Sequence, residues 1–114
     1  MWPTHIHYET KINALSITFD NGDNFLLPAE LLRVESPSAE VQGHSPSQKQ
    51  IVPGKKQVKI TAIEAVGNYA IRISFDDGHN TGLYTWSYLN TLGTDKDRIW
   101  TTYVKALETK GWER

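Results

Sequence analysis

Four histidines are the only soft metal ligands in this chain of 114 residues, because the sequence contains no cysteine. His5 and His7 lie two residues apart on a predicted strand, and alternate residues of a strand share one face. Many metal sites contain two histidines, but they add a third ligand, and none is evident here. We therefore interpret the pair as ordinary surface. The lack of cysteine also excludes disulfides, thiolate catalysis and cysteine-ligated metal sites formed by this chain alone.

Asp76 and Asp77 are adjacent carboxylates, which could suggest acid–base chemistry. Neighbouring residues of a strand point to opposite faces, however, and Asp20-Asn21 occupies the same place in an earlier, similar stretch. Aspartate and asparagine favour turns because their side chains bond to local amides, so a turn explains both pairs. No nucleophile elbow, phosphate-binding glycine loop or metalloprotease motif occurs, and Gly43-His44-Ser45 lacks the flanking glycines of an elbow.

The element that organises the chain is a predicted β-hairpin over residues 71–86. Its residues alternate up to Asp77-Gly78, which can adopt the positive φ values of a type I′ turn. Residues 15–24 repeat residues 71–80, sharing Phe, Asp, Gly and Asn at matching positions. The two stretches predict two related hairpins, with Leu15, Ile17 and Phe19 on a core face.

The remaining pattern predicts a mostly antiparallel α+β domain covering residues 1–114. Strands are expected at 5–9, 24–27, 58–66 and 69–75, with a two-residue turn at Gly67-Asn68. Short helices are expected after each hairpin, at 29–32 and at 86–92, the second ending at Gly93. A longer helix is expected at 95–110, with a Thr94–Asp97 capping box, a stop at Gly111 and packing through Ile99, Trp100, Tyr103 and Leu107.

Residues 36–50 form a predicted long loop, rich in Ser, Pro, Gly and Gln, that separates the two repeats. Loops of this length in a small domain are mobile or functional. In the second hairpin, Ile71, Ile73 and Phe75 should share a face with Tyr69 and Leu83. Tyr84 and Trp86 should project to one common face, where they either fill the core or line an interaction surface.

Composition narrows the class of protein. The net charge of −1 argues against a sequence-independent grip on nucleic acid, which needs several clustered Lys or Arg residues. No apolar run approaches the roughly 20 residues that span a bilayer. The first residues do not resemble a secretion signal. We therefore expect a cytoplasmic monomer without a cofactor and without nucleic-acid or membrane partners.

A series of motifs in the order of the chain resembles one family. The motifs are Phe19-Asp20-Asn21-Gly22, Leu32-Arg33-Val34, Ser36-Pro37-Ser38-Ala39-Glu40-Val41 with Gly43-His44, and Gly67-Asn68-Tyr69-Ala70 through Asp77-Gly78-His79 to Tyr84-Thr85-Trp86. They resemble the DUF971 family, the γ-butyrobetaine hydroxylase-like N-terminal domain. The resemblance implies a small bacterial α+β domain that occurs alone, fused to carnitine-pathway oxygenases, or appended to nucleotide-dependent iron–sulfur carriers.

The resemblance also implies a zinc site in the hydroxylase form, made by three cysteines and a histidine. By motif, the cysteine positions correspond here to Ser36, Ser38 and Val41, and the histidine position corresponds to His79. Because three of the four ligands are replaced, we expect a degenerate site with no metal. We expect His79 instead to tie the 33–46 loop to the second hairpin by a hydrogen bond.

Three hypotheses of function remain. The first is a noncatalytic adaptor that contacts an unidentified protein, as an accessory in iron–sulfur or metal-cofactor metabolism. The second is a metal- or small-ligand-binding domain in which His79, His44 and Glu40 assemble a site without cysteine, and the third is an uncharacterised enzyme. For the first hypothesis the predicted interaction surface comprises Arg33, Glu35, Ser36, Ser38, Glu40, His44, His79, Tyr84 and Trp86.

Overall fold

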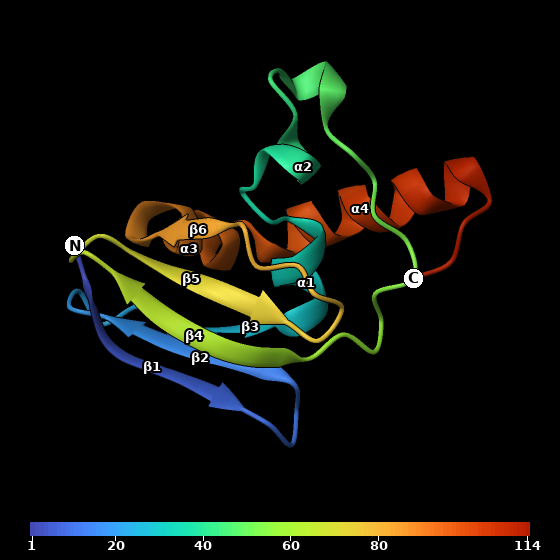
Figure 1. Ribbon diagram of the computed structural model, residues 1–114. Coiled ribbons are helices and arrows are strands. Elements are labelled where there is room, and N and C mark those ends of the chain that lie inside the picture. The colour runs from blue at the N-terminus through green and yellow to red at the C-terminus, as the bar shows by residue number, and fades with distance from the viewer.

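A computed structural model describes all residues from 1 to 114, and it is an α+β structure with two three-stranded antiparallel sheets (Figure 1). The first sheet contains β1 (Pro3–Glu9), β2 (Ala14–Phe19) and β3 (Asn24–Pro28), and the second contains β4 (Ile60–Val66), β5 (Ala70–Phe75) and β6 (Leu83–Thr85). In each sheet the strands follow one another in chain order. The strands thus form two separate meanders.

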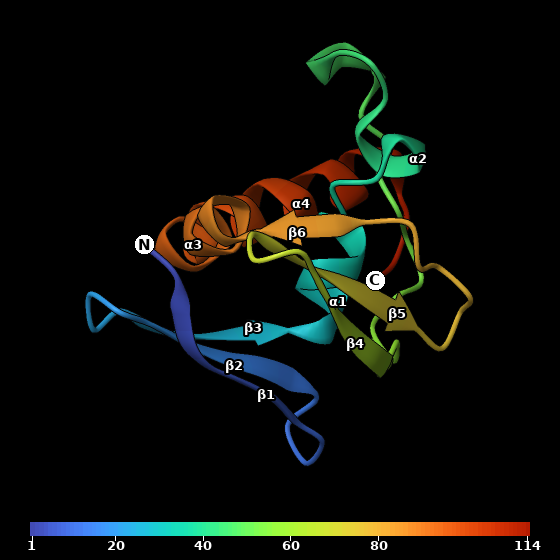
Figure 2. The same cartoon turned by 60° about the vertical axis from the view of Figure 1, so that its left-hand side comes forward.

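Each meander leads into a helix. α1 (Ala29–Val34) follows β3, and α3 (Trp86–Thr94) follows β6, so the predicted helix after each hairpin is confirmed. The predicted C-terminal helix is α4 (Lys96–Lys110). Figure 2 shows the two sheets diverging from each other, with α3 and α4 on the side of β6 and α1 between them.

The segment between the two halves is more structured than a loop. It contains the one-turn helix α2 (Ala39–Gln42) and the 3-10 turn η1 (Pro46–Gln48). Ser38 caps α2 by accepting a hydrogen bond from the Glu40 amide at 3.2 Å. Figures 1 and 2 both show this segment standing out from the rest of the molecule. We refer to residues 35–50 as the projecting segment.

The two hairpin turns have the same backbone geometry, which confirms the internal repeat. The Gly78 amide donates to the Phe75 carbonyl at 3.1 Å, and the Gly22 amide donates to the Phe19 carbonyl at 2.9 Å. The type I′ prediction is wrong, because Asp76 and Asp77 have negative φ and only Gly78, at +90°, is positive. This pattern is typical of a three-residue loop in which glycine closes a bulge.

Two other predicted turn features are also corrected. Val66 pairs with Ala70, so the β4–β5 connection has three residues rather than the two of Gly67-Asn68. Gly93 does not end its helix, because α3 continues to Thr94. Its role is steric: a Cβ on Gly93 would lie 2.3 Å from the ring of Phe25 on β3. The glycine therefore allows α3 to pack against the first sheet.

The main hydrophobic core joins both sheets with α1 and α3. Leu15, Ile17 and Phe19 are buried, as predicted. In the second sheet Ile71, Ile73 and Phe75 are buried beside Tyr84, with the exposed residues on the other face. The prediction that Tyr69 and Leu83 share this buried face is wrong, because their exposed fractions are 51% and 37%.

Polar contacts also join the two halves. Asn13, the only non-glycine residue with positive φ, donates a side-chain hydrogen bond to the Val58 carbonyl at 2.7 Å. The Tyr8 hydroxyl donates to the Asn13 side chain and accepts from the Ile60 amide. These contacts fix the start of β4 against the first meander.

Helix α4 forms a smaller apolar cluster in which Tyr103 and Leu107 pack against Val34. Ile99 and Trp100 are half-buried against the main core, so the predicted packing face is confirmed. The predicted capping box does not form: Asp95, not Thr94, is the N-cap residue, and its side chain makes no capping hydrogen bond. Gly111 ends the helix in the left-handed conformation, as predicted. None of the helices combines the length and the apolar character needed to cross a membrane.

Candidate functional site

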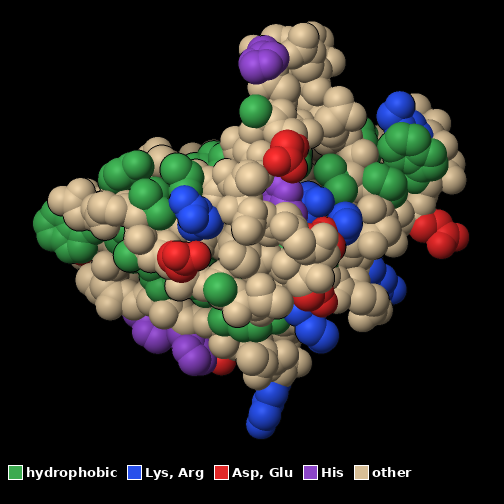
Figure 3. All heavy atoms as spheres, in the orientation of Figure 1, with side chains coloured by type: hydrophobic (Ala, Val, Ile, Leu, Met, Phe, Trp, Pro, Cys, Tyr) green, Lys and Arg blue, Asp and Glu red, His purple; other side chains and the backbone are tan.

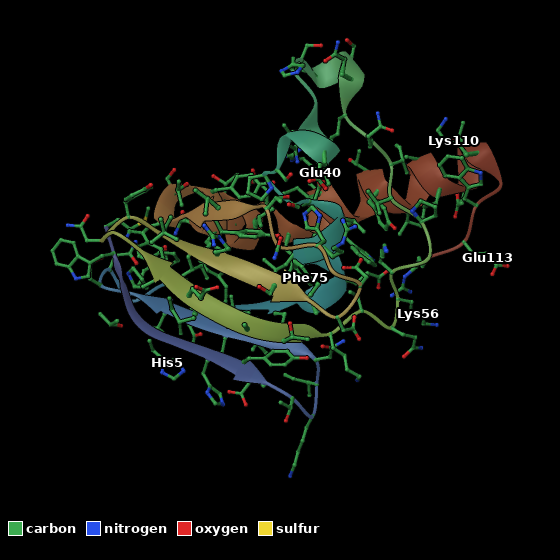
Figure 4. The ribbon with its side chains drawn as sticks, in the orientation of Figure 1. His5, Glu40, Lys56, Phe75, Lys110 and Glu113 are labelled. Carbon is green, nitrogen blue, oxygen red and sulfur yellow. The ribbon has the colours of Figure 1, made fainter.

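The base of the projecting segment is fixed to the second hairpin by polar side chains. Ser36 follows the end of α1, and its Oγ lies 2.8 Å from His79 Nε2, just beyond the β5 turn. Ser38 and Thr81 follow Ser36 and His79 by two residues each, and Ser38 Oγ lies 2.8 Å from Thr81 Oγ1. Figure 4 shows Glu40 on α2 above the end of β5, which Phe75 marks. The predicted hydrogen bond between His79 and the 33–46 loop is therefore present.

His79 makes one contact with each ring nitrogen. Its Nδ1 lies 3.4 Å from a carboxylate oxygen of Glu40, so the ring proton belongs on Nδ1, and Nε2 accepts from the Ser36 hydroxyl. Burial lowers the pKa of His79 below its ordinary value, and the nearby Arg33 adds to this, while Glu40 and Asp77 partly oppose it. The imidazole is consequently neutral at pH 7.

A charged cluster lies beside the histidine. Asp77 Oδ2 is 2.8 Å from Arg33 Nε and 2.7 Å from Lys55 Nζ, and Asp77 Oδ1 accepts from the His79 amide. Burial opposes ionisation of Asp77, but the hydrogen bonds from Lys55, His79 and Arg33 outweigh it and hold the pKa of Asp77 well below its ordinary range. Figure 3 shows a histidine surface between acidic and basic side chains on this face.

At the base of the projecting segment, the backbone at Gly82 packs closely against Ser36 and Pro37. A Cβ on Gly82 would lie 2.6 Å from Ser36 Oγ and 3.1 Å from Pro37, so only glycine allows this approach. Tyr84 is fully buried beneath it and donates its hydroxyl to the Leu32 carbonyl at 2.5 Å. Tyr84 is therefore a core residue, and its predicted place on an interaction surface is wrong. The alternation in the sequence indicated that Tyr84 and Trp86 project to one common face. It did not indicate which face of the sheet the helices cover.

The order Ser36, His79, Glu40 resembles a hydrolase triad, in which a serine hydroxyl meets Nε2 and a carboxylate meets Nδ1. Ser36 is 0% exposed, however, and its Oγ also accepts from the Ser38 amide at 3.2 Å. Ser36 and His79 line neither the pocket of about 370 Å³ nor that of about 140 Å³. The hydroxyl is enclosed by Gly82 and Pro37, so a substrate cannot reach it in this conformation.

The side chains at the implied zinc position do not fit a zinc ion. Two are hydroxyls that already make hydrogen bonds, the third is the buried aliphatic Val41, and only His79 is an ordinary ligand. The alternative set of His79, His44 and Glu40 is not assembled either, because no group of three His, Asp or Glu side chains is close enough to hold a metal ion. Glu40 lies beside His79, but His44 does not complete a site.

The other predicted site residues are divided between buried and exposed positions. Glu35 is buried and forms an ion pair with Lys49, 2.5 Å away. Trp86 is half-buried and donates its indole N–H to the Asn68 carbonyl. His44 is exposed on the projecting segment. His5 and His7 are exposed on β1, and Figure 4 shows His5 pointing away from the body.

Sequence reasoning missed Thr81, Gly82, Lys49 and Lys55 at this base. Each contacts a partner at least 14 positions away in the chain, which no local pattern records. It also missed a pocket of about 370 Å³ under the other side of the projecting segment.

Two β-meanders, each followed by a helix, with a projecting segment fixed between them, define a small α+β domain. The chain belongs to the family described as "Gamma-butyrobetaine hydroxylase-like, N-terminal", whose model matches residues 6–90. This confirms the resemblance found in the sequence. No curated protein matches the chain.

Solved structures support the same assignment. Two NMR solution structures are 43% and 45% identical to this chain and cover 99% of it, with TM-scores of 0.85 and 0.86; the matches span 89% and 84% of those chains. A crystal structure of a protein of unknown function from Acidithiobacillus ferrooxidans ATCC 23270, described as a member of the DUF971 family, is 37% identical. It covers 79% of this chain and 90% of its own, with a TM-score of 0.67.

Proposed function

We propose that this domain is a noncatalytic adaptor that binds a protein through the projecting segment and the adjoining face of the second hairpin. The observation that carries the proposal is the fixed base of the segment, where Ser36 bonds to His79 and Ser38 bonds to Thr81. A segment that stands out from the body but is held at its base loses little conformational freedom on binding. Such preorganisation favours recognition of a protein surface.

Further contacts hold the segment in shape above its base. The Gln50 amide donates to the Val41 carbonyl, the Gln42 side chain donates to the Ser36 carbonyl, and the His44 amide donates to the Gln48 side chain. The outer residues, including Glu40, His44 and Ser47, remain exposed. They offer polar groups to a partner while the backbone is already ordered.

We further propose that the partner acts in iron–sulfur or metal-cofactor metabolism, as the resemblance to domains appended to iron–sulfur carriers suggests. In this proposal the domain positions its partner and catalyses no reaction. The enclosed Ser36 hydroxyl supports a structural rather than a catalytic role for the base.

The test is affinity capture from the native cell, followed by binding measurements with the purified partner. Two variants change the segment, Glu40→Lys and His44→Glu. Glu64→Lys is the matched control, because it makes the same charge change at an exposed position of β4. Melting curves and amide NMR spectra establish that all three variants are folded.

We expect the segment variants to weaken binding of the partner about tenfold or more, and Glu64→Lys to leave it unchanged. If every captured protein binds all three variants as tightly as the wild type, the segment is not the interaction surface and the proposal fails.

A further inference from the structure

A pocket of about 370 Å³ lies between the projecting segment and helices α3 and α4. This is within the usual size range of small-ligand sites. It shares no lining residue with the Ser36–His79 base. The pocket is therefore a second candidate site, on the other side of the projecting segment, whose residues Glu35, Gln42, Lys49 and Gln50 form part of its lining.

Apolar side chains from three parts of the chain line the pocket. Val34 comes from α1, Leu92 from α3, and Ile99 and Ala106 from α4. Val34 and Leu92 are almost completely buried, at 2% and 1% exposure, so they belong to the floor. Ile51, the residue after the projecting segment, adds an apolar wall.

The two tyrosines of the pocket supply ring surface rather than free polar groups. The Tyr88 hydroxyl donates to the Glu35 carbonyl, and the Tyr103 hydroxyl donates to the Val52 carbonyl at 2.7 Å. Burial, with Glu30 nearby, raises the pKa of Tyr103 to about 12, so it remains a hydrogen-bond donor at pH 7. Both hydroxyls are committed to holding the walls together.

The charged side chains of the pocket are Glu35, Lys49 and Arg98. Both carboxylate oxygens of Glu35 contact Lys49 Nζ, at 2.9 and 2.5 Å, so the negative charge of this buried group is neutralised within the wall. Arg98 is more available: its side chain is 69% exposed, and it makes one contact, to Asp95 at 3.1 Å. A guanidinium has five N–H donors, so most of them remain open to a ligand.

We propose that this pocket binds a small organic carboxylate with an apolar body. The apolar body would occupy the floor at Val34, Leu92 and Ile99, and the carboxylate would pair with Arg98, whose planar fork suits two carboxylate oxygens. The exposed hydroxyls of Thr91 and Thr102 flank the same space. A cationic ligand is disfavoured because Arg98 and Lys49 are both positive and Glu35 is already paired.

The experiment compares phenylacetate with phenylacetamide, which has the same shape and no charge, by titrating the isotopically labelled full chain and following its amide NMR signals. Arg98→Gln removes the proposed charge partner. Arg72→Gln is the matched control, because Arg72 is exposed on β5 and does not line the pocket. Thr102→Trp, at an exposed lining position, fills the cavity.

We expect saturable shifts at amides near residues 34–35, 49–51, 88–92 and 98–106, with phenylacetate bound about fivefold more tightly than phenylacetamide. Arg98→Gln should abolish this preference, Arg72→Gln should retain it, and Thr102→Trp should abolish binding of both probes. The proposal is overturned if phenylacetate gives no saturable shift, if the shifts map to another surface, or if the amide binds equally well. It is also overturned if Arg98→Gln keeps the preference.

Discussion

His79 contributes to stability in its neutral form. Its ring contacts Ser36 and Glu40, with Arg33 and Asp77 close by, and burial together with Arg33 lowers its pKa. An unfolded chain would protonate this imidazole near the ordinary value of about 6.5. Just below that pH the unfolded state binds more protons than the folded state, so stability is complete above it and falls as the pH decreases.

The resulting prediction concerns the pH dependence of unfolding. In denaturant titrations between about pH 7 and pH 5, the free energy of unfolding of the wild type should decrease with pH, and His79→Gln should decrease less steeply. Glutamine can still accept a hydrogen bond from the Ser36 hydroxyl. The fold should therefore persist, with a loss of about 1–2 kcal/mol in the free energy of unfolding at pH 7. Equal slopes for the two proteins would contradict this account of His79. His7→Gln, at an exposed position, is the control.

At the scale of elements, the two hairpins depend on a glycine that closes each turn. Gly78 has φ of +90°, and Gly22 has φ of +91°, with no atom within 4 Å of a Cβ at either position. A side chain there would meet backbone strain without a steric clash. Gly78→Val should therefore destabilise the protein by more than about 1 kcal/mol, as measured by the denaturation midpoint at unchanged slope.

Gly22→Val tests the same strain in the first hairpin. Because the two turns have equivalent backbone hydrogen bonds, the two substitutions should lower the free energy of unfolding by similar amounts. An unchanged midpoint for Gly78→Val would show that the turn accepts a residue with negative φ.

Gly93 differs because its constraint is packing. Gly93→Ala places a methyl group 2.3 Å from the Phe25 ring, so α3 and β3 must separate, at a cost of about 1–3 kcal/mol. Shortening the partner should recover part of this loss: Gly93→Ala should cost less in a Phe25→Leu background than in the wild type. Additive costs in this double-mutant cycle would rule out the contact as the cause.

The elements were predictable where the cause is local, and less so where it is distant. Alternating residues and glycine turns indicated both hairpins, and apolar spacing indicated α4. The turn type was wrong because an Asp-Gly pair does not determine which residues pair across the loop. Gly93 resembled a helix end because Phe25, its real partner, belongs to another element.

In the candidate site too, contacts between distant parts of the chain could not be predicted from local sequence patterns. A hydrogen bond from His79 to the 33–46 loop was expected from the family resemblance, not from any local signal, and Ser36 was not predicted as the partner. The pocket was not expected, because its walls come from α1, the projecting segment, α3 and α4, and no single stretch of sequence has its pattern. Tyr84 was misplaced because alternation identifies two faces of a strand but not the one that packs inside.

At the scale of the whole molecule, the two meanders share one core with α1 and α3, α4 packs against it, and the Ser36–His79 contact holds the segment between the halves. The purified, tag-free protein should therefore carry no stoichiometric zinc, and a chelator should not change its melting temperature. Structural zinc needs about four good ligands, and His79 alone provides one. Elemental analysis and melting curves provide the measurement.

A positive control can be made in the same chain. The triple variant Ser36→Cys, Ser38→Cys, Val41→Cys keeps His79 and restores the ligand types that the resemblance implies, so it should take up zinc. One equivalent of tightly held metal in the wild type, or a melting temperature that collapses with the chelator, would refute the prediction.

The location of the projecting segment should also allow residues to be inserted into this chain. Its tip, near Pro46–Gln48, is exposed and lies between two complete meanders, so added residues there interrupt no strand and no core contact. Lengthening a loop costs free energy only slowly, by about 0.6 kcal/mol per doubling. An epitope, a reporter peptide or a whole guest domain inserted after Ser47 should therefore be carried by the folded protein with little change in melting temperature.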